Sequence, residues 1–173
     1  MRKKIAVDIF SGAGGLSIGA EMAGVKTILA VEYDKHAADS FKKNHREATV
    51  LNQDIRTVNP LEHTAKFPFI LMGGPPCQGF SMAGRRKEDD VRNHLVHSYI
   101  KFIELVHPKM LFFENVKGFT QEFKKNKEKG IAYSHLVVEE LEKLGYRTAS
   151  QLVNFGDYGV PQKRTRFILV GLS

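Results

Sequence analysis

The chain of 173 residues contains a single cysteine, Cys77, and therefore cannot form an internal disulfide. A reducing cytoplasm is the expected location, with association to the nucleoid if the source is bacterial. No apolar run approaches the ~20 residues that a membrane-spanning helix needs. Residues 1–4 lead directly into a strand-like run, so we expect no signal peptide. With no internal repeat or low-complexity segment either, the sequence favours one globular domain over residues 1–173.

Acidic residues are outnumbered, with 19 Asp and Glu against 26 Lys and Arg, which gives a net charge of +7. An excess of positive charge favours a polyanionic partner such as nucleic acid. Many proteins are basic for other reasons, so charge alone does not identify the partner. Hydrophobic residues make up 42% and charged residues 26%, which is ordinary for a globular domain.

Short apolar runs alternate with helical patterns along most of the chain. We expect strands at 4–10, 27–32, 49–51, 67–72, 109–114, 146–154 and 166–170, and helices at 16–23, 34–44, 93–107 and 133–144. This alternation is typical of a doubly wound, mostly parallel α/β sheet. The carboxyl ends of parallel strands then meet at one edge of the sheet, where such folds bind their ligands.

The segment from Gly73 to Ser81, GGPPCQGFS, follows the fourth predicted strand. Proline lacks an N–H and fixes φ, so Pro75 and Pro76 end the strand in a stiff, extended loop. A lone cysteine is often a small buried hydrophobe. At a strand end behind two prolines, Cys77 is instead predicted to be a nucleophile, which requires its thiolate form.

Three successive strand ends carry residues suited to a nucleoside. Residues 11–15, SGAGG, form a glycine-rich turn after the first strand, where the backbone can approach a ligand closely. Glu32 ends the second strand and is placed to accept hydrogen bonds from ribose hydroxyls. Asp54 follows the third strand, beside Ile55, and is placed to accept from an adenine amine. NAD is one candidate, although no second nucleotide-binding half follows, and a turn without ligand is the alternative.

Two charged groups follow the later strands. Glu114 closes the fifth strand at the same edge as Cys77, where a carboxyl sharing a proton with a ring nitrogen would activate that ring toward thiol addition. Arg164 and Arg166 fall on one side of an extended segment, so together they can clamp a phosphate or a base carbonyl. The alternative in each case is a solvated surface charge.

Four motifs occur in order: FSGAGG at 10–15, PPCQGFS at 75–81, ENV at 114–116 and QKRTR at 162–166. Together they resemble the catalytic domain of the DNA cytosine-5 methyltransferases, and the resemblance spans essentially the whole chain. It implies a Rossmann-like sheet of seven strands with an antiparallel last strand. It also implies S-adenosylmethionine as cofactor, double-stranded DNA as partner and no metal.

The resemblance also implies roles for particular residues. Cys77 would attack C6 of a cytosine flipped out of the duplex, and Glu114 would hold N3 and the exocyclic amine. Arg164 and Arg166 would support the flipped base and the catalytic loop. The cofactor would contact Phe10, Gly12, Gly14, Glu32, Tyr33, Asp54, Ile55, Pro76 and Leu95. Nucleic acid would contact Gln78, Ser81, Arg85, Arg86 and Asn115.

The resemblance ends with the last predicted strand. Members of the family continue into a target-recognition domain and return with a C-terminal helix that completes the cofactor pocket. We therefore expect a truncated form, a remnant, or one subunit of a split enzyme with a complementary subunit. The same chemistry on transfer RNA, and a non-catalytic module that binds cofactor or nucleic acid, remain alternatives.

Overall fold

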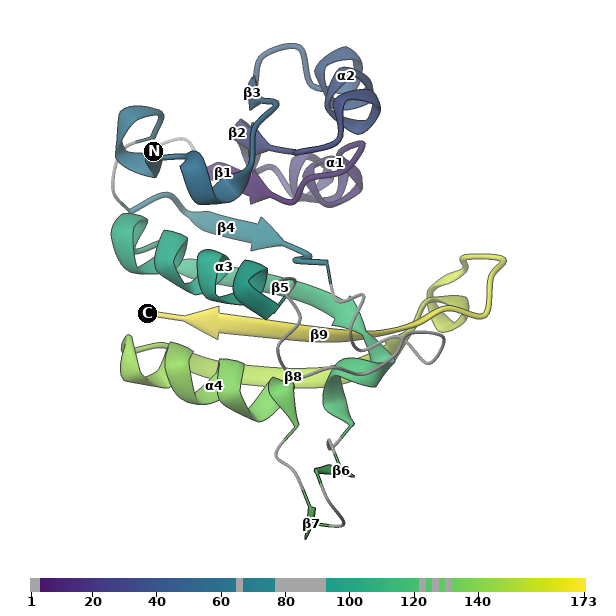
Figure 1. The fold of residues 1–173 in the computed structure, drawn as a ribbon. Helices are drawn as coiled ribbons and strands as arrows, with labels where there is room; N and C mark the ends of the chain where they lie inside the picture. The colour runs from purple at the N-terminus through teal and green to yellow at the C-terminus, as the bar shows by residue number, and fades with distance from the viewer. Residues whose placement is uncertain (1–3, 65–66, 77–92, 122–123, 126–127, 130–131) are drawn as a thin grey trace.

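A seven-stranded sheet runs through the molecule in the order β3-β2-β1-β4-β5-β9-β8 (Figure 1). The computed structural model describes residues 4–64, 67–76, 93–121, 124–125, 128–129 and 132–173. The strands of the sheet are β1 (Ile5–Ile9), β2 (Lys26–Val31), β3 (Thr49–Leu51), β4 (Ile70–Gly73), β5 (Met110–Val116), β8 (Arg147–Asn154) and β9 (Thr165–Leu172). The helices are α1 (Gly15–Met22), α2 (Lys35–Asn44), α3 (Asn93–Val106) and α4 (Tyr133–Lys143).

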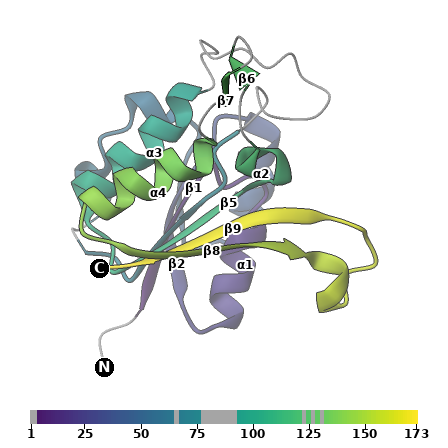
Figure 2. The same cartoon turned by 90° about the horizontal axis from the view of Figure 1, so that it is seen from below.

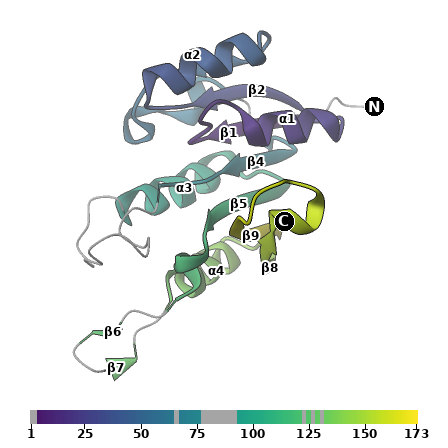
Figure 3. The same ribbon diagram turned by 90° about the vertical axis from the view of Figure 1, so that its right-hand side faces the viewer.

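Shorter elements connect these strands and helices. They are the 3-10 turns η1 (Ile55–Thr57), η2 (Pro60–Glu62), η3 (Lys117–Thr120) and η4 (Phe155–Tyr158), with a small hairpin of β6 (Lys124–Lys125) and β7 (Glu128–Lys129). This hairpin lies far from α1 and α2, at the opposite end of the molecule (Figure 3).

The sheet is parallel except around β9. Strand β1 pairs in parallel with β2 and β4, and β4 with β5, whereas β9 is antiparallel to both β5 and β8. The arrows of β4 and β9 accordingly point in opposite directions (Figure 1). The predicted fold class is confirmed. Because Val116 pairs with Arg166, the carboxyl end of β5 and the start of β9 share one edge of the sheet.

The main core lies on the face covered by α3 and α4, while α1 packs on the other face (Figure 2). Aromatic rings fill this core: the ring centroid of Phe113 lies 5.2 Å from that of Tyr99 and 5.3 Å from that of Phe119. Side chains alternate across a strand, so Leu111 and Phe113 of β5 are buried in this core. Met110 and Phe112 point to the α1 face and are only partly buried.

The α1 face carries an apolar groove of about 400 Å³ beside α1. Leu16 and Ala20 of α1 form one wall, and Ile70, Met72 and Phe112 of β4 and β5 contribute to the other. In the part of the chain that the structure describes, no helix has both the length and the apolar character needed to cross a membrane.

Local sequence signals match the structure closely, with one exception. Asp34 caps α2 as predicted, since its carboxylate accepts a hydrogen bond from the Ala37 N–H at 2.8 Å. The fourth strand, however, begins only at Ile70 and not at Phe67. Phe67 has a φ of +62° and precedes Pro68, so the chain enters β4 from a turn.

Candidate active site

The turn after β1 holds an unusual backbone. Phe10, Gly12 and Gly14 all have positive φ values, of 59°, 55° and 97°. Glycine adopts this region readily, whereas a phenylalanine does so rarely. A Cβ on Gly14 would also lie within 2.4 Å of the His45 ring. The turn is therefore fixed by its glycines, and it brings Phe10 to the carboxyl edge of the sheet.

Glu32 is fastened to this turn from the end of β2. One carboxylate oxygen accepts the Gly12 N–H at 2.8 Å, and the other accepts the Asp34 N–H at 2.8 Å. An ionised carboxylate offers about four acceptor sites, so capacity remains for a ligand's hydroxyl groups. Its position agrees with the predicted role at a ribose, and the role itself stays a prediction.

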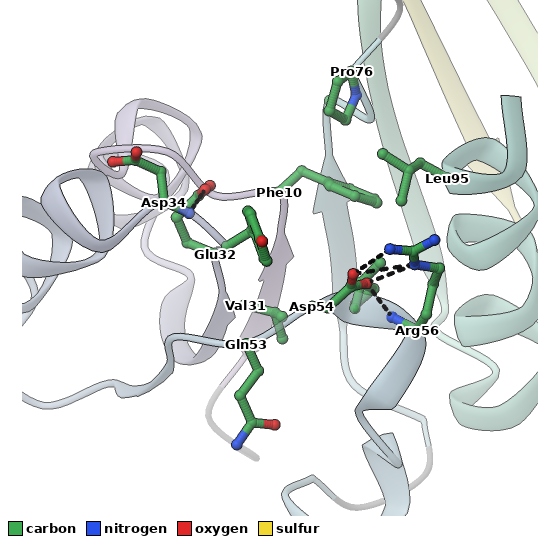
Figure 4. A pocket seen from close by; sticks show the side chains of 12 residues that line it. Phe10, Val31, Glu32, Asp34, Gln53, Asp54, Arg56, Pro76 and Leu95 are labelled. Atoms are coloured by element: carbon green, nitrogen blue, oxygen red, sulfur yellow. Dashed lines mark hydrogen bonds and ion pairs between the residues drawn. The ribbon is translucent and has the colours of Figure 1, made fainter. Parts of the chain in front are cut away.

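A pocket of about 540 Å³ opens beside this carboxylate. Phe10 and Leu95 point toward each other across it, and Pro76 lies above them (Figure 4). The structure brings together seven of the nine residues predicted to bind a cofactor, while Gly12 and Gly14 shape the turn behind it. The pocket is lined by Phe10, Val31, Glu32, Tyr33, Asp34, Gln53, Asp54, Ile55, Arg56, Gly74, Pro76 and Leu95.

Arg56 is a pocket residue that the sequence did not suggest. Its guanidinium Nε lies 2.9 and 3.1 Å from the two carboxylate oxygens of Asp54, as the dashed lines of Figure 4 show. Hydrogen bonds from Arg56 lower the pKa of Asp54 and keep it ionised. An adenine amine at Asp54 would share this carboxylate with the guanidinium.

Glu114 lies at the end of β5 as predicted, and Arg166 holds it there. The Arg166 Nε donates to one Glu114 carboxylate oxygen at 2.8 Å, and the two side chains are 18% and 24% exposed. Arg164 lies just before β9 and is exposed. Thus one arginine of the predicted pair is committed to the carboxylate, and the other faces solvent.

The segment Gly74–Pro76 lies between the 540 Å³ pocket and Glu114. Gly74 and Pro76 line the pocket. A Cβ on Gly74 would lie 2.9 Å from the second Glu114 carboxylate oxygen. The buried Asn115 amide donates to the Pro75 carbonyl at 3.1 Å. Cys77 directly follows this segment.

Five predicted site residues lie outside the described part of the chain: Cys77, Gln78, Ser81, Arg85 and Arg86. Their roles as nucleophile and as nucleic-acid contacts stay predictions. The same holds for Asn115 as a nucleic-acid contact.

Asp8 is a second residue that the sequence reasoning missed, although it is the only acid in the first predicted strand. Its side chain is completely buried, and one carboxylate oxygen accepts from the Ser17 hydroxyl at 2.6 Å. The Thr27 hydroxyl donates in turn to Ser17 at 3.0 Å. Burial raises the pKa of Asp8 to about 7, against the opposing effect of the Ser17 hydrogen bond.

A family model described as C-5 cytosine-specific DNA methylase matches residues 5–173. The chain belongs to this family. It is 39% identical over 173 residues to the type II methyltransferase M1.HphI of Haemophilus parahaemolyticus, covering 95% of this chain and 45% of that protein. It is 35% identical over 190 residues to M.AquIA of Picosynechococcus, covering 99% of this chain and 72% of that protein.

Solved structures share this fold. A prophage-encoded protein from E. coli, described as a DNA modification methyltransferase, superimposes with a TM-score of 0.80 at 30% identity, over 98% of this chain and 46% of that one. The Dnmt2 methyltransferase of S. pombe shares the fold, with a TM-score of 0.73 at 17% identity over 97% of this chain and 48% of that one. The chain thus spans less than half the length of several proteins that it matches.

Proposed function

We propose that this chain is the catalytic part of an enzyme that transfers a methyl group from S-adenosylmethionine to C5 of cytosine in double-stranded DNA, as part of restriction–modification or another form of DNA methylation. One observation carries the proposal: a single segment, Gly74–Pro76, is shared by the cofactor pocket and by Glu114, and leads directly into Cys77. Cofactor, nucleophile and acid would therefore meet at one point of the sheet edge.

The pocket residues fit S-adenosylmethionine in their chemistry. Phe10 and Leu95 offer apolar surfaces on either side of a flat base, with Tyr33 and Ile55 also in the lining. Glu32 supplies acceptors for ribose hydroxyls, and Asp54 an acceptor for the adenine amine. The bound cofactor would supply the methyl group as an electrophile.

The chain's own residues would prepare the cytosine. The Cys77 thiolate adds to C6 of a base flipped out of the duplex, and the electron pair of the 5,6 double bond moves toward C5. The Glu114 carboxyl shares a proton with N3, which accepts the displaced charge, while Arg166 holds the other oxygen of this carboxyl in place. After methyl transfer, loss of the C5 proton restores the double bond and releases the thiolate.

A complementary part, either a further segment or a separate subunit, belongs to the same proposal. It would carry target recognition and cover the cofactor site. The apolar groove beside α1 supports it. Work on DNA would place the assembly in the cytoplasm, at the nucleoid if the source is bacterial.

The test is methyl transfer from labelled S-adenosylmethionine to cytosine-containing duplex DNA, by the chain alone and with a supplied C-terminal half from a relative. Transfer in either arm supports the proposal. Transfer to transfer RNA but not to DNA would establish the RNA alternative. Cofactor binding without any transfer, in both arms and on both substrates, would leave the chain a non-catalytic binding module.

The substitution Cys77→Ser examines the nucleophile. A serine hydroxyl is far less nucleophilic than a thiolate, so methyl transfer should be abolished. Cofactor affinity, measured by calorimetry, should stay within about twofold, because Cys77 is assigned to the base and not to the cofactor. A variant that retained full activity would show that the nucleophile assignment is wrong.

A further inference from the structure

We propose that Asn115 is a positioning residue: its side chain fastens the Gly74–Pro76 segment to the end of β5, so that Cys77 and Glu114 are presented together. This inference rests on the proposed function for the roles of Cys77 and Glu114. The attachment itself is visible in the structure.

Both the nitrogen and the oxygen of the Asn115 amide form hydrogen bonds inside the protein. Its Nδ2 donates to the Pro75 carbonyl at 3.1 Å, and its Oδ1 accepts the Val116 N–H at 2.9 Å. The residue is 3% exposed. Removing one partner from a buried hydrogen bond leaves the other unsatisfied, so this amide is strongly fixed in its orientation. An amide held in this way faces the protein backbone.

The strand register explains why a side chain is needed here. Strands β4 and β5 pair in parallel from Ile70 with Met110 to Gly73 with Phe113. Continuing the register places Pro75 opposite Asn115. Pro75 and Pro76 have no N–H to donate, so a backbone ladder cannot extend along them. The Asn115 amide supplies a donor where the backbone ladder stops.

The close approach of Gly74 is a second, independent sign of this attachment. A Cβ at Gly74 would lie 2.9 Å from a Glu114 carboxylate oxygen and 3.4 Å from the Glu114 carbonyl oxygen. The segment before Cys77 therefore lies directly against Glu114. Gly74 lies against Glu114, and the neighbouring Asn115 is bonded to Pro75. These two adjacent residues of β5 therefore fix the segment that leads to Cys77.

Two variants test the role. Asn115→Asp keeps the acceptor for the Val116 N–H but replaces the donor by a charged oxygen facing the Pro75 carbonyl. Asn115→Ala removes both bonds without adding charge. Misplacing a reacting group by about 1 Å can cost ~100-fold in rate, so we expect each variant to slow single-turnover methyl transfer by about tenfold or more. Affinity for S-adenosylmethionine should change by less than about threefold, because most of the pocket is unaltered.

Tyr146→Phe is the matched control. It also removes a buried side-chain hydrogen bond to a proline carbonyl, from the Tyr146 hydroxyl to Pro108 at 2.7 Å. Pro108 precedes β5 at its other end, far from Glu114 along the strand. This variant should lose stability as the Asn115 variants do, yet keep the wild-type rate of transfer.

A second measurement needs neither DNA nor a complementary part. Cys77 is the only cysteine, so the rate at which iodoacetamide adds to the folded chain reports on this residue alone. We expect faster alkylation in both Asn115 variants, because the segment before Cys77 is released from β5, and an unchanged rate in Tyr146→Phe.

The inference would be overturned if the Asn115 variants fold and keep the wild-type rates of methyl transfer and of alkylation. An equal loss of transfer in Tyr146→Phe would overturn it too, because the effect would then be one of general stability. If the wild-type chain transferred no methyl group in any arm, the proposed function would fail, while the alkylation rates would still decide the role of Asn115.

Discussion

The buried carboxyl of Asp8 makes the stability of the fold depend on pH. The carboxyl is completely buried, one oxygen has no hydrogen-bond partner among the described residues, and its pKa is raised to about 7. In the unfolded chain an aspartate ionises near its ordinary value of 3.8. Between about pH 4 and 7 the unfolded state therefore binds fewer protons than the folded state, and rising pH lowers the free energy of unfolding.

We expect Asp8→Asn to remove this loss. As pH rises from about 4 to 8, the free energy of unfolding of the variant should increase relative to that of the wild type, by at most about 4 kcal/mol. Urea unfolding at a series of pH values measures it. Asp39→Asn, at an exposed aspartate of α2, is the control. Parallel pH curves for wild type and Asp8→Asn would contradict the assignment.

At the residue scale, single positions were predictable where the signal is local. Asp34 was predicted as an N-cap because its bond reaches only to Ala37. Glu32 and Glu114 were predicted because parallel strands deliver their ends to one edge. The bond from Asn115 to Pro75 was not predicted, because it depends on the register of two strands. The bond from Arg56 to Asp54 was not predicted either, because it depends on side-chain rotamers.

At the scale of elements, β5 separates two very different environments. Phe113 is completely buried among aromatic rings on the side of α3 and α4. Phe112 belongs to the opposite face and lines the groove beside α1. The two neighbouring residues have the same side chain, so their substitution compares the two faces directly.

Phe113→Ala should cost about 3–5 kcal/mol in the free energy of unfolding, the range for a fully buried phenylalanine. Phe112→Ala should cost no more than about half as much, because its ring already contacts open space. Chemical denaturation of the two variants checks the difference. Equal losses would mean that the groove is covered in solution, and repeating the experiment with the complementary half should raise the cost of Phe112→Ala.

The same contrast explains which elements were predictable. The strands and helices of residues 4–51 follow from apolar runs bounded by glycine or a capping aspartate. Strand β4 was predicted to begin three residues too early, because nothing in the apolar run at 67–72 reveals a positive φ at Phe67. That the last strand, β9, would be antiparallel came from the family resemblance. Its position between β5 and β8 was not predicted, since spacing alone does not specify strand order.

At the scale of the whole molecule, the net charge of +7 predicts a weak attraction to any nucleic acid. Each phosphate neutralised by Lys or Arg releases a counterion, so binding to a duplex lacking cytosine should weaken about tenfold or more between ~50 and ~200 mM salt. Fluorescence anisotropy with labelled duplex measures this. Binding that is independent of salt would show that charge does not drive the contact.

The position of β9 has a consequence for how the chain is made. Strand β8 pairs only with β9 among the described strands, and β9 alone joins it to β5. On a ribosome, residues 5–116 can assemble the parallel strands early, but β8 has no strand to pair with until residues 165–172 emerge. During that interval the edge of β5 that later pairs with β9 is open, so a nascent chain is exposed to mispairing at the strand that carries Glu114.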